Sequence, residues 1–226
     1  ALARSRRSQT ARLLIDQTNL SLTEIAFTAG FASIRQFNES MQEAFGCAPS
    51  TLRRHAQPGG SGDGRLTLRL QYHPPFDADA LLTFLGKRAL PGVEELKAGR
   101  YRRTVAFPRS QGIIEIEPIA AAHAVFIHLQ LNDLGDLSLL VQRCRHLFDL
   151  DADPTAIATV LSADPVLAPL VETHPGLRVP GAISGFEMAV RAILGQQVSV
   201  GGARTLLGRL VATLGEPLAE AHGALT

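Results

Sequence analysis

Three polar side chains that lie close together in the sequence could contact DNA bases. Arg35, Gln36 and Asn38 follow a glycine turn, on a stretch with helical spacing. Arginine can hydrogen-bond guanine through two donors, and glutamine or asparagine can pair with adenine in a similar way. We interpret these three residues as candidate base contacts, with solvated surface as the alternative. Glu39 lies on the same stretch, where its charge would repel the phosphate backbone.

An acidic cluster offers a second kind of chemistry. Asp149, Asp151 and Asp153 have the spacing that opens a calcium-binding loop, but Pro154 stands where that loop needs glycine and Val160 where it needs glutamate. We therefore expect these aspartates to end one helix and cap the next.

The remaining residues that could bind a metal do not have the spacing of a metal site. We expect structural roles for the histidines at four positions: His73, His123, His128 and His174. Cys47 and Cys144 have no paired spacing, and we interpret both as small buried side chains. The sequence therefore predicts no metal site and no cofactor.

The candidate base contacts lie on a predicted helix-turn-helix. Ser21 and Glu24 fit a capping box for a helix over residues 22–29, which ends at Gly30. Ser33 can cap the next helix, which extends to about residue 45. Its apolar residues Phe37, Met41 and Phe45 are expected to pack inward. An ordinary helical hairpin is the alternative that this spacing leaves open.

In the rest of the chain the spacing of the apolar residues changes twice. Residues 58–64 are rich in glycine and predict a linker. Alternating apolar residues then predict strands near residues 66–72, 101–107, 114–116 and 125–131, with helices at 77–88 and 136–148. From Pro154 onward the pattern is helical, with an apolar stripe that stops at Gly195. We expect an antiparallel sheet with helices packed on it, followed by an all-helical segment.

Residues 10–54 resemble the second helix-turn-helix of AraC-type regulators. The residues that match are Ile25-Ala26, Gly30-Phe31, Ser33, Phe37, Phe45-Gly46, Pro49 and Leu52-Arg53. The resemblance implies that residues 8–18 form the long helix joining the two halves of that domain, and that the first half would precede this chain. It also implies that Ser33, Arg35, Gln36 and Asn38 lie at the DNA.

The body, from about Arg65 to Thr226, resembles the AlkA family of 3-methyladenine DNA glycosylases. The most specific stretch is Pro175-Gly176-Leu177-Arg178-Val179-Pro180-Gly181, followed by Phe186-Glu187 and residues 190–200. Tyr72, Pro74-Pro75-Phe76-Asp77, residues 81–88 and Leu147-Phe148-Asp149-Leu150 also match. The resemblance implies a sheet of TATA-box-binding-protein-like form with helices, then the start of an all-helical domain of the helix-hairpin-helix class. The whole resembles the Ada–AlkA fusions.

The resemblance assigns roles to three residues of the body. A base must leave the duplex before it can be cleaved. Gln197 stands at the family's wedge position, which fills the gap in the stack, and Gln196 lies beside it. Phe84 matches the aromatic residue that the sheet domain contributes to the base pocket, where a cationic alkylated purine would be attracted to its face. The alternatives are a polar interhelical loop and a core phenylalanine.

We therefore expect a DNA-alkylation repair protein divided into residues 1–57 (helix-turn-helix), 58–64 (linker), 65–152 (sheet domain) and 153–226 (start of the glycosylase domain). The family's catalytic aspartate would lie beyond Thr226, so the expected glycosylase activity would be missing from this chain. The alternatives are an AraC-type regulator with a noncatalytic DNA-binding body and a nonfunctional remnant.

The expected partners follow from the interpretation as a DNA-alkylation repair protein with a regulator module. They are double-stranded DNA, which carries alkylated bases or a promoter sequence, and RNA polymerase through the regulator module, with no membrane partner. Residues 1–57 carry seven arginines against four acidic residues, a balance of +3, so the remainder carries −2 of the net +1. A basic head suits a nucleic-acid contact. We expect a cytoplasmic, nucleoid-associated monomer.

Overall fold

The computed structural model describes residues 2–18, 20–55 and 66–218, without the side chains of residues 2–6, 17 and 55. The predicted linker at 58–64 lies outside the described residues. By its internal contacts the chain divides into two compact units. One comprises residues 1–69, 105–114 and 126–141, and the other comprises residues 70–104, 115–125 and 142–226.

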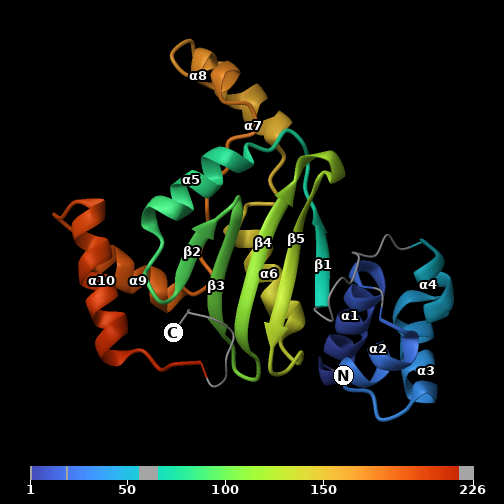
Figure 1. The fold of residues 1–226 in the computed structure, drawn as a ribbon. Helices are drawn as coiled ribbons and strands as arrows, with labels where there is room; N and C mark the ends of the chain where they lie inside the picture. The colour runs from blue at the N-terminus through green and yellow to red at the C-terminus, as the bar shows by residue number, and fades with distance from the viewer. Residues whose placement is uncertain (1, 19, 56–65, 219–226) are drawn as a thin grey trace. The chain divides into compact units, whose positions relative to one another are not determined.

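Four helices of the first unit form the head. They are α1 (Leu2–Gln17), α2 (Leu22–Thr28), α3 (Ile34–Phe45) and α4 (Pro49–His55), blue to cyan in Figure 1. The predicted capping box is present, because Glu24 N donates to Ser21 Oγ and Ser21 N donates to the Glu24 carboxylate. Gly30 has a φ of 85°, a left-handed conformation that glycine adopts without a side-chain clash, so the chain can turn sharply between α2 and α3.

The head has its own apolar core. Leu14 and Ile15 of α1, Ile25 of α2, and Phe37 and Met41 of α3 are fully buried. The spacing of α3 therefore predicted its buried face correctly at residues 37 and 41.

The prediction for Phe45 was only partly correct. This residue is half-buried, because its ring lies 5.8 Å from the Arg12 guanidinium carbon at the surface of α1. A cation can bind the face of an aromatic ring that is partly exposed to solvent, so this contact does not require full burial of Phe45.

Five strands form one antiparallel sheet in the order β1-β5-β4-β3-β2 (Figure 1). Their bounds are β1 (Leu66–Gln71), β2 (Glu94–Lys97), β3 (Arg100–Ala106), β4 (Gln111–Ile119) and β5 (Ala124–Leu131). Strand β2 was not predicted, because its residues Glu-Glu-Leu-Lys show no alternation of apolar side chains. It forms by pairing with β3, with Leu96 opposite Tyr101.

The helices predicted at 77–88 and 136–148 are present as α5 (Ala78–Arg88) and α6 (Leu137–Leu147). The segment from Pro154 onward, for which only helical structure was predicted, forms α7 (Pro154–Leu161), α8 (Ala168–Thr173), α9 (Gly185–Leu194) and α10 (Val200–Leu214). A short 3-10 helix lies at Ala120–Ala122. Asp77 caps α5, and Asp153 caps α7 as predicted, because its Oδ1 accepts from the amides of Thr155 and Ala156. In the second unit α5 contacts β2 and α10, and α9 contacts α10.

The predicted fold class is confirmed: a helix-turn-helix, an antiparallel sheet with helices, and an all-helical segment. No described helix is long and apolar enough to cross a membrane. The described residues contain no group of three or more His, Cys, Asp or Glu side chains placed to hold a metal ion. Cys144 is buried as predicted, whereas Cys47 is only half-buried.

Candidate functional site

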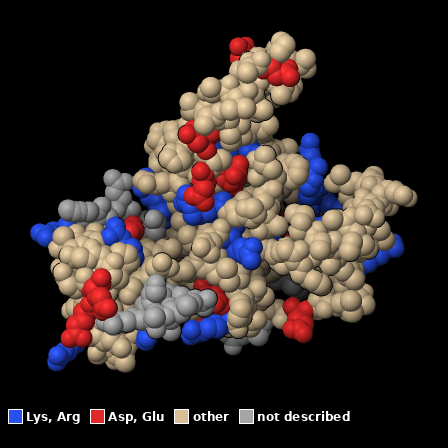
Figure 2. Space-filling model, turned by 180° about the vertical axis from the view of Figure 1, so that it is seen from behind, with Lys and Arg blue, Asp and Glu red and all other residues tan. Residues whose placement is uncertain are grey.

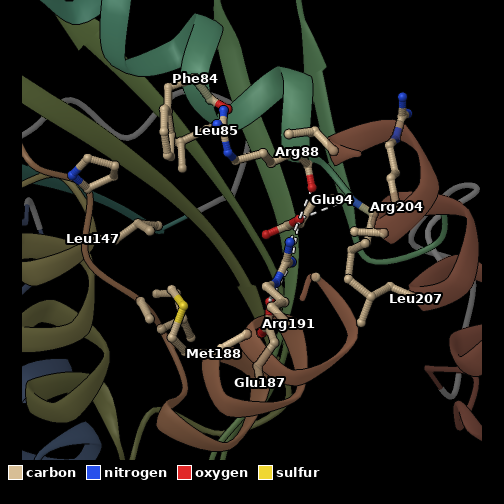
Figure 3. Close-up of a pocket in the computed structure, with 18 of the residues that line it drawn as sticks. Phe84, Leu85, Arg88, Glu94, Leu147, Glu187, Met188, Arg191, Arg204 and Leu207 are labelled. Carbon is tan, nitrogen blue, oxygen red and sulfur yellow. Dashed lines mark hydrogen bonds and ion pairs between the residues drawn. The ribbon is translucent and has the colours of Figure 1, made fainter. Parts of the chain in front are cut away.

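A largely apolar pocket of about 350 Å³ lies in the second unit. Its walls come from α5, β2, β3, α9 and α10 and from residues 180–183. The apolar lining residues shown in Figure 3 include Phe84, Leu85, Leu147, Met188 and Leu207. Four arginines and two glutamates also line it: Arg88, Arg103, Arg191, Arg204, Glu94 and Glu187. A concave apolar site with a few convergent charges is the usual form of a binding site for a small ring system.

Most of these charges form a shared ionic cluster at the pocket wall. The Arg103 side chain, from β3, is 5% exposed and pairs with Glu94 of β2 at 3.1 Å and with Glu187 of α9 at 2.7 Å. Arg191 of α9 pairs with the same two carboxylates at 2.7 and 2.6 Å, and Figure 3 shows it lying between them. Tyr101 donates its hydroxyl to Glu94 at 2.5 Å. Both glutamates are therefore committed to ion pairs.

The ion pairs with Arg103 and Arg191 determine the pKa of Glu187. Burial alone would raise the pKa of Glu187, but the charges of Arg103 and then Arg191, with their hydrogen bonds, outweigh burial and lower it. Glu187 is accordingly a charged structural partner. It does not have the raised pKa of a proton donor.

The predicted wedge residues lie on a short exposed loop between α9 and α10. Gln196 and Gln197 are both exposed, and Gln197 has a φ of 59°. A left-handed conformation is uncommon for a residue with a side chain and costs about 1–2 kcal/mol. Ser199 ends the loop by capping α10, where its hydroxyl accepts from the amide of Gly202.

Two arginines anchor this loop from both sides to the same helix end. Arg191, six positions before Gln197, donates to the carbonyl of Arg88 at 3.1 Å. Arg204, seven positions after it, donates to the carbonyl of Ala89 at 2.7 Å. These carbonyls belong to the C-terminal end of α5, where free carbonyls attract cations. The loop is thereby held to the helix that carries Phe84.

Phe84 lines the pocket from α5 and is 39% exposed, so it is not a core residue. The guanidinium carbon of Arg88, one turn further along α5, lies 3.7 Å from the centre of its ring. Arg88 also donates to the carbonyl of Phe84 at 3.3 Å. Figure 3 shows the two side chains against each other at the pocket wall.

Another buried arginine explains the most specific stretch of the sequence. Arg178 donates to four backbone carbonyls, those of His73, Pro75, Asp149 and Ala152. These carbonyls belong to two loops, one that precedes α5 and one that follows α6.

Gly176 allows the close approach that Arg178 needs. It has a φ of 79°, and a Cβ atom there would lie 2.5 Å from the carbonyl carbon of Pro75. The amide of Asp77, the cap of α5, donates to the carbonyl of Gly176 at 2.9 Å. The stretch around Gly176 and Arg178 thus supports the start of the helix that carries Phe84.

In the head, the structure places the predicted base contacts on α3. Ser33 caps this helix by accepting from the amide of Gln36, and the Gln36 side chain accepts from the amide of Ala32. Ser33 and Gln36 thus stabilise the helix start. Arg35 and Asn38 are exposed.

The charge of Glu39, which we expected to repel the DNA phosphates, is balanced by an arginine of the same helix. Its carboxylate pairs with Arg35 at 2.9 Å, and both side chains are exposed. Figure 2 shows charges on one face of the molecule, where blue basic and red acidic side chains lie in small separate groups.

No role was predicted for the charged residues that support this site: Arg88, Glu94, Arg103, Arg178, Glu187, Arg191 and Arg204. Several of them, such as Arg178 and Glu187, lie in the stretches that carry the family resemblance. One signal was available, because the alternation of Tyr101 and Val105 places Arg103 on their buried face. A buried arginine needs hydrogen-bond acceptors, either a carboxylate that also neutralises its charge or, as for Arg178, a set of carbonyl groups. Nothing in the pattern, however, could identify Glu187, 84 positions away, as the partner of Arg103.

This architecture defines a class of protein in which a helix-turn-helix head is joined to a sheet-and-helix body with a pocket beside an exposed glutamine loop. Residues 67–184 match the family described as the AlkA N-terminal domain, and residues 1–55 match a helix-turn-helix domain family of AraC type. The chain belongs to the AlkA N-terminal domain family.

Two curated relatives agree with this assignment. Over its whole length the chain is 45% identical to a Mycobacterium tuberculosis protein named "probable bifunctional transcriptional activator/DNA repair enzyme AlkA", of which it covers 46%. It is 34% identical to DNA-3-methyladenine glycosylase 2 of Escherichia coli over 149 residues, which are 66% of this chain and 51% of that protein. The chain spans about half the length of these relatives.

A solved structure shares the fold. The 3-methyladenine DNA-glycosylase from Archaeoglobus fulgidus superposes with a TM-score of 0.58 at 19% identity, over 69% of this chain and 53% of that one.

Proposed function

We propose that this chain is the base-extruding part of a DNA-alkylation repair glycosylase that releases 3-methyladenine and related bases by hydrolysing the N-glycosyl bond. The observation that carries the proposal is the anchoring of the Gln196–Gln197 loop, through Arg191 and Arg204, to the helix that bears Phe84. A wedge that enters the base stack and a pocket wall that receives the base must keep a fixed spacing, because flipping costs a few kcal/mol that both contacts must offset.

Gln197 is the proposed wedge, and Gln196 lies beside it. An amide fills the gap left in the stack less completely than leucine would, but it can hydrogen-bond the unpaired base opposite. The exposed position of the loop and the φ of Gln197 support this role, because backbone strain at an exposed polar residue is frequent at functional sites.

We propose that residues 1–226 do not cleave the bond by themselves. The carboxylates that line the pocket, Glu94 and Glu187, each pair with two arginines. A carboxylate held in this way is poorly placed to stabilise positive charge developing on a sugar. The proposed division into domains at 1–57, 65–152 and 153–226 assigns extrusion to the last two.

Base release from methylated duplex DNA tests this proposal. The complete gene product should release 3-methyladenine from methylated DNA and nothing from unmodified DNA, whereas residues 1–226 alone should release none. Release by residues 1–226 would mean that a catalytic group lies among the residues that we assign to structure. Failure of the complete gene product to release any base would favour a regulator with a noncatalytic DNA-binding body.

For the head we propose sequence-specific binding of double-stranded DNA, with α3 in the major groove and Arg35 and Asn38 at base edges. Ser33 and Gln36 would set the start of that helix, from which Gln36 could also reach a base. The regulator would act in the cytoplasm, associated with the nucleoid, as a monomer that contacts RNA polymerase.

Footprinting on the promoter region of its own gene tests the role of the head. At the protein concentration at which the wild-type head protects a DNA site, Arg35→Ala should leave that site unprotected. Arg54→Ala on α4 removes the same charge and serves as the matched control. Equal loss in both variants would indicate a charge effect without base reading.

A further inference from the structure

Arg204 of α10 uses only part of its hydrogen-bonding capacity within the protein. Its Nε donates to the carbonyl of Ala89 at 2.7 Å, which leaves the two terminal amino groups of the guanidinium. Among the residues that the structure describes, these groups have no ion-pair or hydrogen-bond partner, and Arg204 is exposed. Figure 3 shows the guanidinium end directed away from the ion pairs of Glu94 and Arg191. An arginine held at Nε can still bind an anion end-on, through both terminal amino groups.

The surroundings of Arg204 do not oppose its charge. Helix α10 contains no acidic residue. The glutamates that line the neighbouring pocket, Glu94 and Glu187, are each paired with two arginines. An anion that approached Arg204 would therefore meet a cation whose charge no described side chain compensates.

The surface beside Arg204 has room for a DNA backbone. Gly201, in the first turn of α10, is exposed, and a Cβ atom added there would have the Ser199 hydroxyl, 4.0 Å away, as its nearest described neighbour outside the helix backbone. Arg204 lies four positions after Val200, the first residue of the helix, which is about 6 Å along the helix axis. Two base-pair steps of DNA span a similar length, roughly 7 Å. The guanidinium is thus within reach of phosphates a few steps from a base displaced by Gln197.

We propose that Arg204 binds one backbone phosphate of the DNA next to the extruded base, end-on through its terminal amino groups, while its Nε stays on the Ala89 carbonyl. One guanidinium then joins the DNA backbone to the end of the helix that carries Phe84. Because the guanidinium is planar and rigid, this contact sets the distance between the docked strand and the pocket wall. The proposal rests on the proposed function, because it takes Gln197 to lie at the extruded base.

Neutralising single phosphates locates the contact. The probe is a dye-labelled duplex with 2-aminopurine mispaired with cytosine, in which a methylphosphonate replaces one phosphate at a time on either side of the 2-aminopurine. Affinity is measured by fluorescence anisotropy at one fixed salt concentration, because phosphate contacts make DNA binding depend on salt. The emission of 2-aminopurine in unlabelled copies of the same duplexes reports base extrusion separately.

We expect one methylphosphonate position to weaken binding of the wild-type chain about fivefold through the loss of the Arg204 contact. Arg204→Gln should bind the unmodified duplex about fivefold more weakly and lose no further affinity at that position, because both changes remove the same contact. Glutamine removes the charge and the terminal amino groups but keeps a nitrogen donor at the position of Nε, so the contact with Ala89 can persist. Arg204→Lys restores the charge and should recover part of the effect.

Arg209→Gln is the matched control. Arg209 is an exposed cation on the same helix, about 140° around its axis from Arg204. Its replacement removes the same charge and should leave the fivefold effect of the methylphosphonate unchanged. An unchanged thermal midpoint in tyrosine fluorescence shows that each variant is folded.

The outcomes separate this inference from the proposed function. If Arg204→Gln binds as tightly as the wild type, or loses affinity at the same methylphosphonate positions by the same factors, Arg204 binds no phosphate, and a rise in 2-aminopurine emission still supports the proposed function. If Arg204 and one phosphate are coupled but the emission rises in no variant, Arg204 binds DNA and the proposed extrusion fails. Failure of the wild-type chain to bind the duplex would overturn both.

Discussion

Replacing Glu94 with glutamine should strongly destabilise the second unit. The Glu94 side chain is 7% exposed, and it accepts from Tyr101, Arg103, Arg191 and the amide of Leu90. Glutamine keeps the shape but removes the charge. It also turns an amide group toward two guanidinium groups that need acceptors.

The size of the effect follows from the geometry. Removing one partner of a buried ion pair costs about 3–5 kcal/mol. Arg103 and Arg191 keep Glu187, so we take the lower end, about 3 kcal/mol. In a chain of this size each kcal/mol corresponds to roughly 2–4 °C, which predicts a fall in Tm of about 6–12 °C.

Tyrosine fluorescence during thermal and urea unfolding is the assay. The chain has no tryptophan and two tyrosines, Tyr72 and Tyr101, which both lie in the second unit, so the signal reports on that unit and not on the head. Glu95→Gln on the same strand is the matched control, and its effect should stay within about 0.5 kcal/mol. If Glu94→Gln unfolds at the same temperature as Glu95→Gln, the cluster is not the buried, shared network described above.

Three further predictions follow from the same unit. The folded-state pKa of Glu187 is lowered, so its contribution to stability is present above the unfolded pKa of about 4.3 and is lost as pH falls through the folded value. In urea titrations, acid should therefore destabilise the wild type more than it destabilises Glu187→Gln. An equal acid response of the two proteins would contradict the ion pairs of Glu187. Burial, partly opposed by the charge of Arg103, raises the pKa of Cys144 to about 12, so a thiol reagent at neutral pH should label Cys47 alone until urea unfolds the chain. Arg178→Lys should lower the free energy of unfolding by about 2–3 kcal/mol, because one ammonium group cannot satisfy the four carbonyls that the guanidinium binds; an unchanged urea midpoint would show that these contacts contribute little.

Local signals predicted local structure well. The capping box of Ser21 and Glu24, the turn at Gly30 and the caps at Ser33 and Asp153 depend on residues within four positions of one another, and all are present. Alternation predicted four of the five strands, because one face of each is buried.

Features that depend on distant residues could not be predicted in this way. Strand β2 has no pattern of its own and exists through its pairing with β3. Arg103 could be placed on a buried face, but its partner Glu187 lies on α9, 84 positions along the chain, and only the folded structure brings the two side chains together. The stacking of Arg88 on Phe84 is local, at four positions' separation, yet it depends on the rotamers of two long side chains, which spacing does not fix.

The roles of Gln197 and Phe84 were predicted from the family resemblance and not from the pattern. Alone, a Gly-Gln-Gln sequence after an apolar stripe indicates only a loop. The structure adds the contacts of Arg191 and Arg204 on either side of that loop, which the spacing did not predict.

Base extrusion by this chain tests the central claim most directly. The probe is a duplex with 2-aminopurine mispaired with cytosine, because a mismatched base costs least to flip and 2-aminopurine brightens when it leaves the stack. At saturating DNA binding, the wild-type chain should raise the fluorescence and Gln197→Leu should raise it at least as much. Gln197→Ala should raise it little, whereas Gln142→Ala, at an exposed glutamine on α6, should match the wild type. An equal rise in wild type and Gln197→Ala, or no rise in any bound variant, would contradict the claim that this loop extrudes a base.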